Sequence, residues 1–312
     1  MKRLFFFLPL LLLLTGCRAE EYKETRFLMD TVCTVRADSK EAVMAAFSVI
    51  GEIARVSDFY QEDSTVSAFN RANAGEPVPL DPHTETMIKT ALSVCEASGG
   101  AFDITIAPVK ELWNFTEGAT PPAQEELQKV LPQVDWEFLS LDTQNHTLTK
   151  TKDGVKIDLG AVAKGYGADM AKAAMVDTGA AWGVLDLGGN VLVFGKNPKN
   201  PDGSWEVGIQ KPFGSAGEYQ KTVTIENTGA VVTSGIYQRN FTYEGKTYHH
   251  ILDPKTGYPV ENTLASVTVS GNSALLADCL STACFVLGKE DGQRLCDAFL
   301  MNFIPITMEE TP

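Results

Sequence analysis

The sequence predicts an α+β fold, in which mixed or antiparallel sheets and packed helices form two intimately packed lobes. Segments of strand character outnumber helical segments and frequently follow one another directly, which argues against a doubly wound sheet. The chain has 312 residues, of which 44% are apolar, and no low-complexity run or Pro/Ser-rich linker divides it. Such a chain can bury a sizeable core in one large domain or in two closely packed lobes.

The N-terminal segment predicts a secretory signal rather than a membrane span. Met1-Lys2-Arg3 supplies a positive start, and the apolar run from Leu4 to Leu14 is too short for an ordinary spanning helix. Leu14-Thr15-Gly16-Cys17 then resembles a bacterial lipobox, in which the cysteine thiol receives a diacylglyceryl group. An ordinary signal peptide with a chance cysteine is the alternative.

We therefore expect a lipoprotein signal peptide at residues 1–16, a lipid anchor and tether at residues 17–26 with Cys17 lipidated, and a functional domain at residues 27–312. The expected location is extracytoplasmic, with the protein lipid-anchored to the bacterial cell membrane. Loss of the two basic residues of the signal lowers the formal charge from −14 to −16, which argues against nucleic acid as a partner. To bind an anionic ligand, such a protein needs a local source of positive potential, such as a metal ion or a helix N-terminus.

The cysteine pattern argues against both a disulfide framework and a zinc site. Five cysteines follow Cys17, which is an odd number, and no close CxxC pair occurs among them. Cys95, Cys279 and Cys284 sit in apolar helical patterns and are expected to be small core residues.

In the N-terminal half, we expect a strand over Phe27–Ala37 with Met29-Asp30-Thr31 at its middle. Apolar residues at helical spacing predict an amphipathic helix over Lys40–Phe59. Asp81-Pro82 supplies the cap and first-turn proline of another helix, which stops at Gly99-Gly100. The remaining expected elements are a short helix at Thr65–Arg71, an exit into a strand at Ala101–Thr105, one short helix within residues 116–135, and a strand at Lys150–Asp158.

The C-terminal half is expected to be rich in strands. A helix is expected over Ala168–Val176, and the last strong helix spans Ser273–Val286 and ends at Gly288. The expected strands are Gly183–Gly188, Val191–Gly195, Trp205–Gln210, Thr222–Thr228, Ala230–Ser234 and Leu264–Val269, with a hairpin over Phe241–Tyr248 that turns at Glu244-Gly245.

Common nucleotide-binding and hydrolase motifs are incomplete or missing. Gly245-Lys246-Thr247 has the tail of a P-loop, but Asn240 stands where the leading glycine is required. Gly165-Tyr166-Gly167 lacks the third glycine of a dinucleotide fingerprint. No Gly-x-Ser-x-Gly elbow occurs, so an ordinary serine hydrolase is not expected either.

The loop from His249 to Pro259 is the densest cluster of functional residue types. It holds two of the four histidines, Asp253 and a Lys-Thr-Gly turn, and its prolines forbid regular helix. Such a loop is typical of a functional site. A hairpin turn with solvated polar residues is the alternative.

Two other segments suit an anionic ligand and a cation. Asp158 leads a glycine-containing turn, where the backbone can approach a ligand closely and Lys164 can contact a phosphate or a pyrimidine; a solvated turn is the alternative. Asp278 and Thr282 are one helical turn apart, and a carboxylate and a hydroxyl at that spacing suit Mg²⁺. A lone aspartate in so apolar a helix would otherwise need a partner.

Six short motifs follow one another along the chain. They are Gly100-Ala101-Phe102-Asp103-Ile104-Thr105, Asp158-Leu159-Gly160-Ala161 with Lys164-Gly165-Tyr166, Leu187-Gly188-Gly189-Asn190, Thr233-Ser234-Gly235, His250-Ile251-Leu252-Asp253-Pro254 with Thr256-Gly257, and Ala277-Asp278 with Ser281-Thr282-Ala283. In this order they resemble the ApbE family, the FAD:protein FMN transferases of bacterial envelopes. The resemblance covers roughly Phe27 to Leu287, and six ordered motifs are far more specific than any single one.

The resemblance implies an ApbE-like fold and an enzyme of the phosphotransferase class. Such an enzyme cleaves FAD as its substrate, uses Mg²⁺, transfers FMN to a threonine hydroxyl of an acceptor protein such as an envelope flavoprotein subunit, and releases AMP. The implied FAD contacts are Met29, Tyr60, Ala101, Phe102, Asp103, Asp158, Lys164 and Leu252. The implied metal contacts are Asp278, Thr282 and the main-chain carbonyl of Ala161, with Ser281 a further candidate where some relatives carry aspartate.

His250 is the candidate general base, because imidazole titrates near neutrality. A histidine that merely orients the loop or the ligand is the alternative. His249 is expected to face the opposite side of the extended segment. Tyr60 and Phe102 are candidates to stack on the flavin or adenine rings, with core packing the alternative for Phe102.

Two other functions use the same residues. In a Mg²⁺-dependent FAD pyrophosphatase, water would replace the acceptor hydroxyl, and free FMN and AMP would leave. A non-enzymatic flavin-binding lipoprotein would store or deliver FAD.

Overall fold

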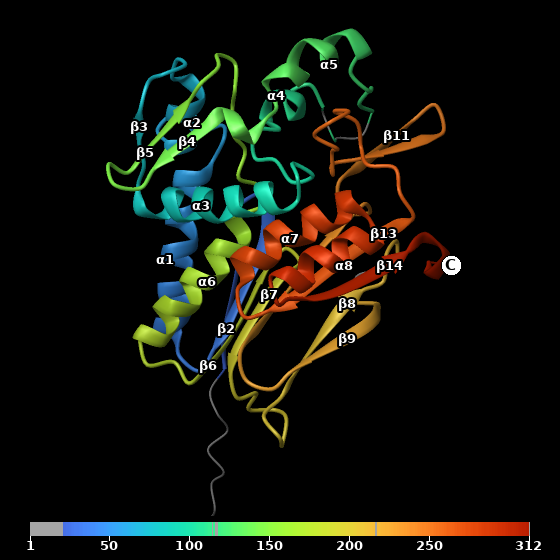
Figure 1. Cartoon of the computed structure of the whole chain (residues 1–312). Helices are drawn as coiled ribbons and strands as arrows, with labels where there is room; N and C mark the ends of the chain where they lie inside the picture. Colours follow the sequence, from blue (N-terminus) through green and yellow to red (C-terminus); the bar gives the residue numbers. More distant parts are fainter. Residues whose placement is uncertain (1–20, 114, 116–117, 216, 312) are drawn as a thin grey trace, which may run out of the picture.

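A seven-stranded sheet forms the centre of the molecule in the computed structural model, which describes residues 21–113, 115, 118–215 and 217–311. Its order is β1-β2-β6-β7-β10-β13-β14, and every neighbouring pair is antiparallel (Figure 1). The strands are β1 (Tyr22–Leu28), β2 (Thr31–Ala37), β6 (Trp182–Leu187), β7 (Asn190–Gly195), β10 (Gly229–Gly235), β13 (Leu264–Gly271) and β14 (Asn302–Thr307). The predicted α+β class with antiparallel sheets is confirmed.

The predicted signal peptide and Cys17 lie outside the described residues. Residues 22–26, expected to be part of a tether, belong to β1 and pair with β2 in the central sheet. In the described part of the chain, no helix is both long and apolar enough to cross a membrane.

The single strand expected over Phe27–Ala37 is wrong, because the chain reverses in its middle. Met29 and Asp30 adopt positive φ angles of 52° and 55°, which closes a two-residue hairpin between β1 and β2. No glycine marks this turn, so its sequence gives no ordinary hairpin signal. The hairpin between residues 182–187 and 190–195 turns at Gly188-Gly189. Gly188 lies against Thr31, since a Cβ on Gly188 would lie 1.9 Å from the Thr31 Oγ1. The tips of the two hairpins are therefore side by side.

Each face of the central sheet is covered differently. Along β6, Leu185 and Leu187 pack in one core with the helices, whereas Trp182 and Val184 pack in another with the separate β8–β9 ribbon. This alternation follows from the two-residue period of a strand. The helices on the first face are α1 (Lys40–Ser57), α6 (Ala163–Asp177), α7 (Ala274–Leu287) and α8 (Lys289–Ala298), and the ribbon consists of β8 (Trp205–Gln210) and β9 (Tyr219–Ile225).

A smaller lobe sits beyond the end of the central sheet (Figure 1). It holds a three-stranded sheet in the order β3-β5-β4 together with several helices. One continuous core joins the lobes, since Leu148 and Phe102 belong to the same buried cluster as Val267 and Leu280. The elements are α2 (Thr65–Arg71), β3 (Val78–Pro79), α3 (Pro82–Ala97), α4 (Ala107–Lys110), α5 (Gln124–Val130), β4 (Leu139–Asp142) and β5 (Thr147–Lys150), with 3₁₀ turns at Leu131–Gln133 and Trp136–Phe138.

A third small unit is the hairpin of β11 (Asn240–Tyr243) and β12 (Lys246–His249), which turns at Glu244-Gly245 as predicted. The predicted helix cap at Asp81 is confirmed, and Ser64 and Ser273 cap α2 and α7 in the same way: each side chain accepts a main-chain N–H of the first turn.

Several expected boundaries are wrong. The turn at 101–105 leads into α4 instead of a strand, and residues 151–158 form an irregular segment with one isolated bridge between Ile106 and Lys156. Helix α6 begins at Ala163, earlier than expected, so Lys164 lies in its first turn. Neither α8 nor β14 was expected; α8 has a mostly polar surface, and β14 is recruited by pairing with β13.

Candidate functional site

The junction between α6 and α7 brings two of the predicted segments together. Asp278 is 3% exposed, and its Oδ2 accepts a hydrogen bond from the Gly165 N–H at 2.9 Å. Its other oxygen, Oδ1, faces the Lys164 Nζ at 3.7 Å. The partner that a buried aspartate requires is thus the first turn of α6, whose N-terminal dipole also favours a negative charge.

Gly165 makes this junction possible. A Cβ at this position would lie 2.2 Å from the Ala274 carbonyl oxygen and 2.7 Å from the Asp278 Cβ. Any larger residue would therefore force α6 away from α7. The glycine serves close packing of two backbones rather than a positive φ angle.

Lys164 lies at the centre of the site. Its Nζ donates to the Gly160 carbonyl at 2.9 Å while facing Asp278. Through these two contacts the side chain joins the turn that follows Asp158 to the carboxylate of α7. One ammonium therefore links two of the three segments in which the sequence placed functional residues.

Thr282 and Ala161 supply further oxygen atoms on the segments that meet at Asp278. Thr282 follows one helical turn later, and its Oγ1 lies 3.2 Å from the Ser234 Oγ of β10. The Ala161 carbonyl precedes the first α6 hydrogen bond, and in the described part of the chain no donor is paired with it. A carboxylate, a hydroxyl and a free carbonyl are the donor types that suit a hard cation.

Ser281, the further metal candidate, is fully buried and points toward the sheet. Its Oγ donates to the Asp278 carbonyl at 3.0 Å and lies 2.8 Å from the Ser234 Oγ. These contacts anchor α7 on β10. Within the described residues, no group of three or more His, Cys, Asp or Glu side chains could hold a metal ion. A cation at this junction would consequently rely on carbonyl and hydroxyl oxygens beside the single carboxylate of Asp278.

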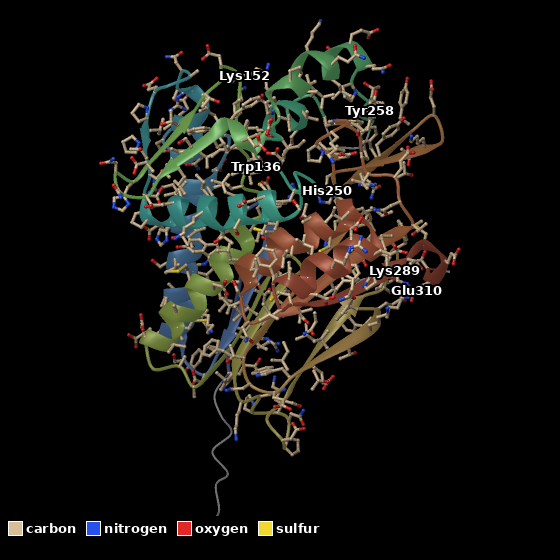
Figure 2. All side chains as sticks on the ribbon, viewed as in Figure 1. Trp136, Lys152, His250, Tyr258, Lys289 and Glu310 are labelled. Carbon is tan, nitrogen blue, oxygen red and sulfur yellow. The ribbon has the colours of Figure 1, made fainter. Side chains whose placement is uncertain are left out.

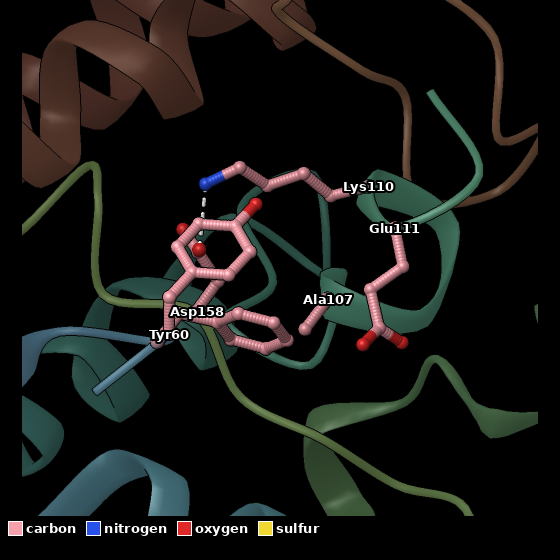
Figure 3. Close-up of a pocket in the computed structure, with 6 residues that line it drawn as sticks. Tyr60, Ala107, Lys110, Glu111 and Asp158 are labelled. Carbon is pink, nitrogen blue, oxygen red and sulfur yellow. Dashed lines mark hydrogen bonds and ion pairs between the residues drawn. The ribbon is translucent and has the colours of Figure 1, made fainter. Parts of the chain in front are cut away.

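Asp158 lines a small pocket with Lys110, Tyr60 and Ala107 (Figure 3). Its Oδ2 accepts from the Lys110 Nζ at 2.6 Å, and its Oδ1 accepts from the Gly160 N–H at 2.9 Å. Burial acts to raise the pKa of Asp158, but the Lys110 charge and these hydrogen bonds outweigh it, so the pKa lies below its ordinary value. The carboxylate therefore stays ionised at neutral pH.

Tyr60 is well placed to stack on a ring. It is 77% exposed, and its ring meets Phe59 edge-on with the centroids 5.1 Å apart. Figure 3 shows the ring beside the Lys110–Asp158 pair. An exposed tyrosine at the mouth of a charged pocket has no core role, which favours the predicted ligand contact.

Arg239 connects His250 to the β1–β2 hairpin. Its Nη2 donates to the Asp30 carbonyl at 3.0 Å, while its own carbonyl accepts from the His250 main-chain N–H at 3.1 Å. Met29, the other residue of that hairpin turn, points to α6: a Cβ on Gly167 would lie 3.3 Å from the Met29 Cε. The hairpin tip is thereby held between the histidine loop and α6.

The two histidines lie in different surroundings. His249 is 7% exposed, and both ring nitrogens are used: Nε2 donates to the Val260 carbonyl at 3.0 Å, and Nδ1 accepts from the Ile251 N–H at 3.3 Å. His250 is half-buried between α7 and the β11–β12 hairpin (Figure 2). Burial lowers its pKa to about 4, so the ring is neutral at pH 7.

A single hydrogen bond fixes the tautomer of His250. The Nδ1 lies 3.2 Å from the Arg239 carbonyl, which can only accept, so Nδ1 carries the proton. Nε2 is then the unprotonated nitrogen and can accept a proton. The ring is set up as a base rather than as an acid.

Most side chains of the turn at residues 101–105 have a structural role. Ala101 and Phe102 are 7% and 5% exposed, and Phe102 lies in the core that joins the two lobes. Both oxygens of Asp103 are occupied by the Thr105 N–H and hydroxyl and by the Trp136 N–H. Burial raises the pKa of Asp103 despite these hydrogen bonds. Gly100 and Asp103 line an open depression of about 570 Å³, together with Trp136 and Pro254.

Leu252 packs in a cluster of aromatic side chains and is 8% exposed. The Trp113 Nε1 donates to the Gly257 carbonyl at 2.8 Å, which holds the histidine loop against α4. Leu252 also forms an isolated bridge with Pro259. Its side chain therefore stabilises the loop.

Lys110 and Arg239 are functional candidates that the sequence did not single out. Lys110 could have been suspected as a basic residue shortly after the 100–105 motif in an acidic protein. Arg239 carried no signal, because its partner Asp30 is 209 positions away in the chain.

The comparisons with known proteins identify the family. The model of the ApbE family matches residues 29–303. A relative from Treponema pallidum named FAD:protein FMN transferase is 31% identical over 301 residues, covering 90% of this chain and 83% of that protein. A relative of the same name from Vibrio cholerae is 32% identical over 311 residues, covering 96% and 90%.

Solved structures show the same fold. The crystal structure of the ApbE protein from Thermotoga maritima superposes with a TM-score of 0.83 at 31% identity, covering 93% of this chain and 95% of that one. The flavin transferase ApbE from Vibrio cholerae gives 0.81 at 29% identity, with 93% and 94% covered. Both confirm the fold predicted from the sequence.

Proposed function

The chain belongs to the ApbE family, and from this premise we propose that it is an FAD:protein FMN transferase. It moves FMN from FAD to a threonine hydroxyl of an acceptor protein, such as an envelope flavoprotein subunit, and releases AMP. The observation that carries this proposal is the position of Lys164, whose ammonium faces Asp278 and donates to the Gly160 carbonyl in the turn that follows Asp158. That arrangement suits a ligand with two linked phosphates.

We propose that Mg²⁺ is held by Asp278, Thr282 and the Ala161 carbonyl. Support comes from the hard oxygen donors at this junction and from the unpaired carbonyl. When bound, the ion offsets the charge of the pyrophosphate and of the acidic protein, and it stabilises charge that develops during transfer. Ser281 anchors α7 through its buried hydrogen bonds, and we do not include it among the proposed ligands.

His250 acts as the general base in this proposal. Its Nε2 takes the proton from the acceptor threonine, whose Oγ forms a new ester bond to the phosphorus on the flavin side of FAD. The bond from that phosphorus to the bridging oxygen breaks, and the oxygen leaves as part of AMP. The neutral ring with Nδ1–H fixed by Arg239 supports this role over one that merely orients the loop.

Asp158, Lys110 and Tyr60 form the other wall of the proposed FAD site. The ionised Asp158 is a hydrogen-bond acceptor for the N–H groups of a flavin or an adenine, and the Tyr60 ring offers a stacking surface. For Ala101, Phe102, Asp103 and Leu252, the buried side chains favour contact with FAD through the main chain.

We also propose that the protein is anchored outside the cytoplasm through a lipid on Cys17. The ordered charged, apolar and small-residue pattern of residues 1–17 supports this. In a detergent phase-partition assay of cells, the wild-type chain should enter the detergent phase and Cys17→Ser the aqueous phase. Equal partition of both chains would contradict the anchor.

The transfer reaction can be tested with residues 18–312, FAD, Mg²⁺ and a candidate acceptor domain. Covalent flavin fluorescence on a denaturing gel and AMP release are measured together. Labelled acceptor with an equal amount of AMP supports transfer. AMP without label would mean that water is the acceptor and that the protein is a pyrophosphatase, and neither product would leave only a flavin-binding role.

A matched acceptor makes the assay specific. Replacement of the target threonine by alanine should remove the label, whereas replacement by serine should keep part of it, since the hydroxyl survives. His250→Gln should lower the rate about 100-fold or more, because general-base catalysis contributes roughly 10²–10⁴-fold. His249→Gln serves as its control and should act mainly on stability.

A further inference from the structure

We infer that Cys284 and Cys296 form a disulfide that fastens α8 to α7. Their sulfur atoms lie 3.4 Å apart, although the residues are separated by 12 positions in the chain. Both side chains are fully buried and free in the structure. The odd cysteine count and the missing CxxC pair gave no hint of this contact, because the turn between the two helices creates it.

The packing of α8 on α7 places the pair at bonding range. The Cys284 Sγ donates to the Gly292 carbonyl at 3.3 Å, and a Cβ on Gly292 would lie 3.0 Å from the Cys284 Cβ. A glycine at this position lets α8 come close. To reach a disulfide length of about 2.05 Å, the sulfurs must approach by roughly 1.4 Å, which side-chain rotation and a small helix shift can supply.

The chemistry requires an oxidant of the disulfide class, such as oxidised glutathione or an oxidised thiol–disulfide exchange protein. The two thiols lose two protons and two electrons as the Sγ–Sγ bond forms. The oxidant accepts them as its own S–S bond breaks and yields two thiols. Such oxidants act in the extracytoplasmic compartment that we propose for this protein.

Bond formation must precede the final packing of α8 or follow its local detachment. The Cys296 contact and burial raise the pKa of the Cys284 thiol, so the reactive thiolate is scarce in the closed fold. Helix α8 is a ten-residue element whose N-cap, Gly288, provides no side-chain hydrogen bond. It is therefore a segment that can open without unfolding the sheet.

The pairing is selective among the five described cysteines. Cys33 lies on β2, where its Sγ donates to the Leu28 carbonyl at 3.6 Å. Cys95 and Cys279 are buried in the core between α3 and α7 without a sulfur–sulfur contact like that of Cys284 and Cys296. Oxidation should thus give one intramolecular link.

The link would brace the helix that carries the proposed metal ligands. Cys284 lies two residues after Thr282 on α7, so the disulfide ties the last turns of that helix to α8 and, through it, to β14. Because a closed loop reduces the entropy of the unfolded chain, the oxidised protein should unfold at a higher temperature.

The test uses the full chain, refolded with oxidised glutathione and in parallel with dithiothreitol. Free thiols are alkylated in denaturant without reduction, and digested peptides are mapped by mass spectrometry. We expect a Cys284–Cys296 linked peptide, two fewer alkylated thiols than in the reduced sample, and a Tm higher by on the order of 5 °C. Full alkylation after oxidative refolding, or a link between other cysteines, would overturn the proposal.

Two cysteine variants distinguish the effect of the disulfide on Tm from other effects of the oxidant. Cys296→Ser should abolish the redox-dependent difference in Tm, and Cys33→Ser, the control, should retain it. If Cys296→Ser does not fold, the linked peptide from the wild-type chain decides the outcome without it. A redox-dependent Tm difference that persists in a folded Cys296→Ser would also contradict the proposal.

Discussion

Two regions of the molecule bury an aspartate that the sequence assigned to the site, and they use it in different ways. In the turn at residues 101–105, Asp103 accepts from the Thr105 N–H at 2.8 Å, the Thr105 hydroxyl at 2.6 Å and the Trp136 N–H at 3.0 Å. At the α6–α7 junction, Asp278 accepts from the Gly165 N–H at 2.9 Å, but its second oxygen is 3.7 Å from Lys164. That separation exceeds a hydrogen-bond distance.

The difference shows which observation separates a scaffold from a site. Both carboxylates are almost fully buried, so burial alone does not distinguish them. Every oxygen of Asp103 is satisfied by groups of the protein itself, and such a carboxylate holds a turn together. Asp278 keeps one oxygen toward the Lys164 ammonium without a hydrogen bond, and a carboxylate of this kind is available to a ligand.

The largest effect is expected from Asp278→Ala. Loss of the single carboxylate at the junction should remove metal binding and lower the transfer rate by about 10³-fold or more. Mg²⁺ should raise the Tm of the wild-type protein but not of the variant, as measured by thermal unfolding with and without the ion. Undiminished transfer by the variant would place the metal elsewhere.

Gly165→Ala tests whether the junction depends on close helix packing. The new Cβ would lie 2.2 Å from the Ala274 carbonyl oxygen, so α6 must shift. This shift should lower the free energy of unfolding by about 1–3 kcal/mol. Displacement of Lys164 should also lower the transfer rate on the order of 100-fold.

Gly51→Ala provides the matched control for that change. Gly51 also lies within a helix, and no atom comes within 4 Å of a Cβ built there. We expect unchanged transfer and a gain of roughly 0.5–1 kcal/mol, because alanine is the better helix former. Equal losses in the two variants would show that the junction is not especially tight.

A smaller and different effect is expected from Asp103→Asn. The amide nitrogen of asparagine can only donate, so it must face at least one of the donors that a carboxylate oxygen now accepts from. This mismatch should lower the free energy of unfolding by about 1–3 kcal/mol and lower Tm by several degrees. Below the unfolding transition, the transfer rate should stay within a few-fold of wild type. A rate loss as large as that of Asp278→Ala, without a change in Tm, would remove the distinction between the two regions.

The mildest test is pH. Burial lowers the pKa of His250 to about 4. If His250 is the base, the transfer rate should not change between pH 7 and pH 6, and it should fall as the pH approaches 4. The pKa of His249 is also lowered by burial. Below the ordinary histidine pKa of about 6.5, the unfolded chain binds more protons than the folded one, so the free energy of unfolding should decrease there. An acid limb of the rate near pH 6.5 would contradict the buried, neutral base.

Local patterns in the sequence predicted the elements whose causes are local. Helix α2 and strand β8 have the predicted bounds, and the cap at Asp81 was predicted from a single side chain. The candidate site residues were mostly identified through the ordered motifs. Their spacing on one helix, as for Asp278 and Thr282, follows from helix geometry alone.

The tertiary structure decided everything that depends on distant partners. The reversal at Met29-Asp30 lacks a glycine signal and is fixed by strand pairing and by the contact from Arg239, 209 positions away. The ion pair of Lys110 with Asp158 spans 48 positions. Each of these depends on which surfaces meet when the sheet and helices pack, and a periodic pattern along the chain carries no such information.

The aspartates at positions 103 and 278 illustrate the same division. The sequence by itself established that both are acidic residues within ordered motifs of an α+β protein. Only packing decided that Asp103 would be enclosed by donors of its own turn and of Trp136, and that Asp278 would meet the first turn of α6 across Gly165. The physical reason is that hydrogen-bond satisfaction of a buried carboxylate is a property of its three-dimensional surroundings.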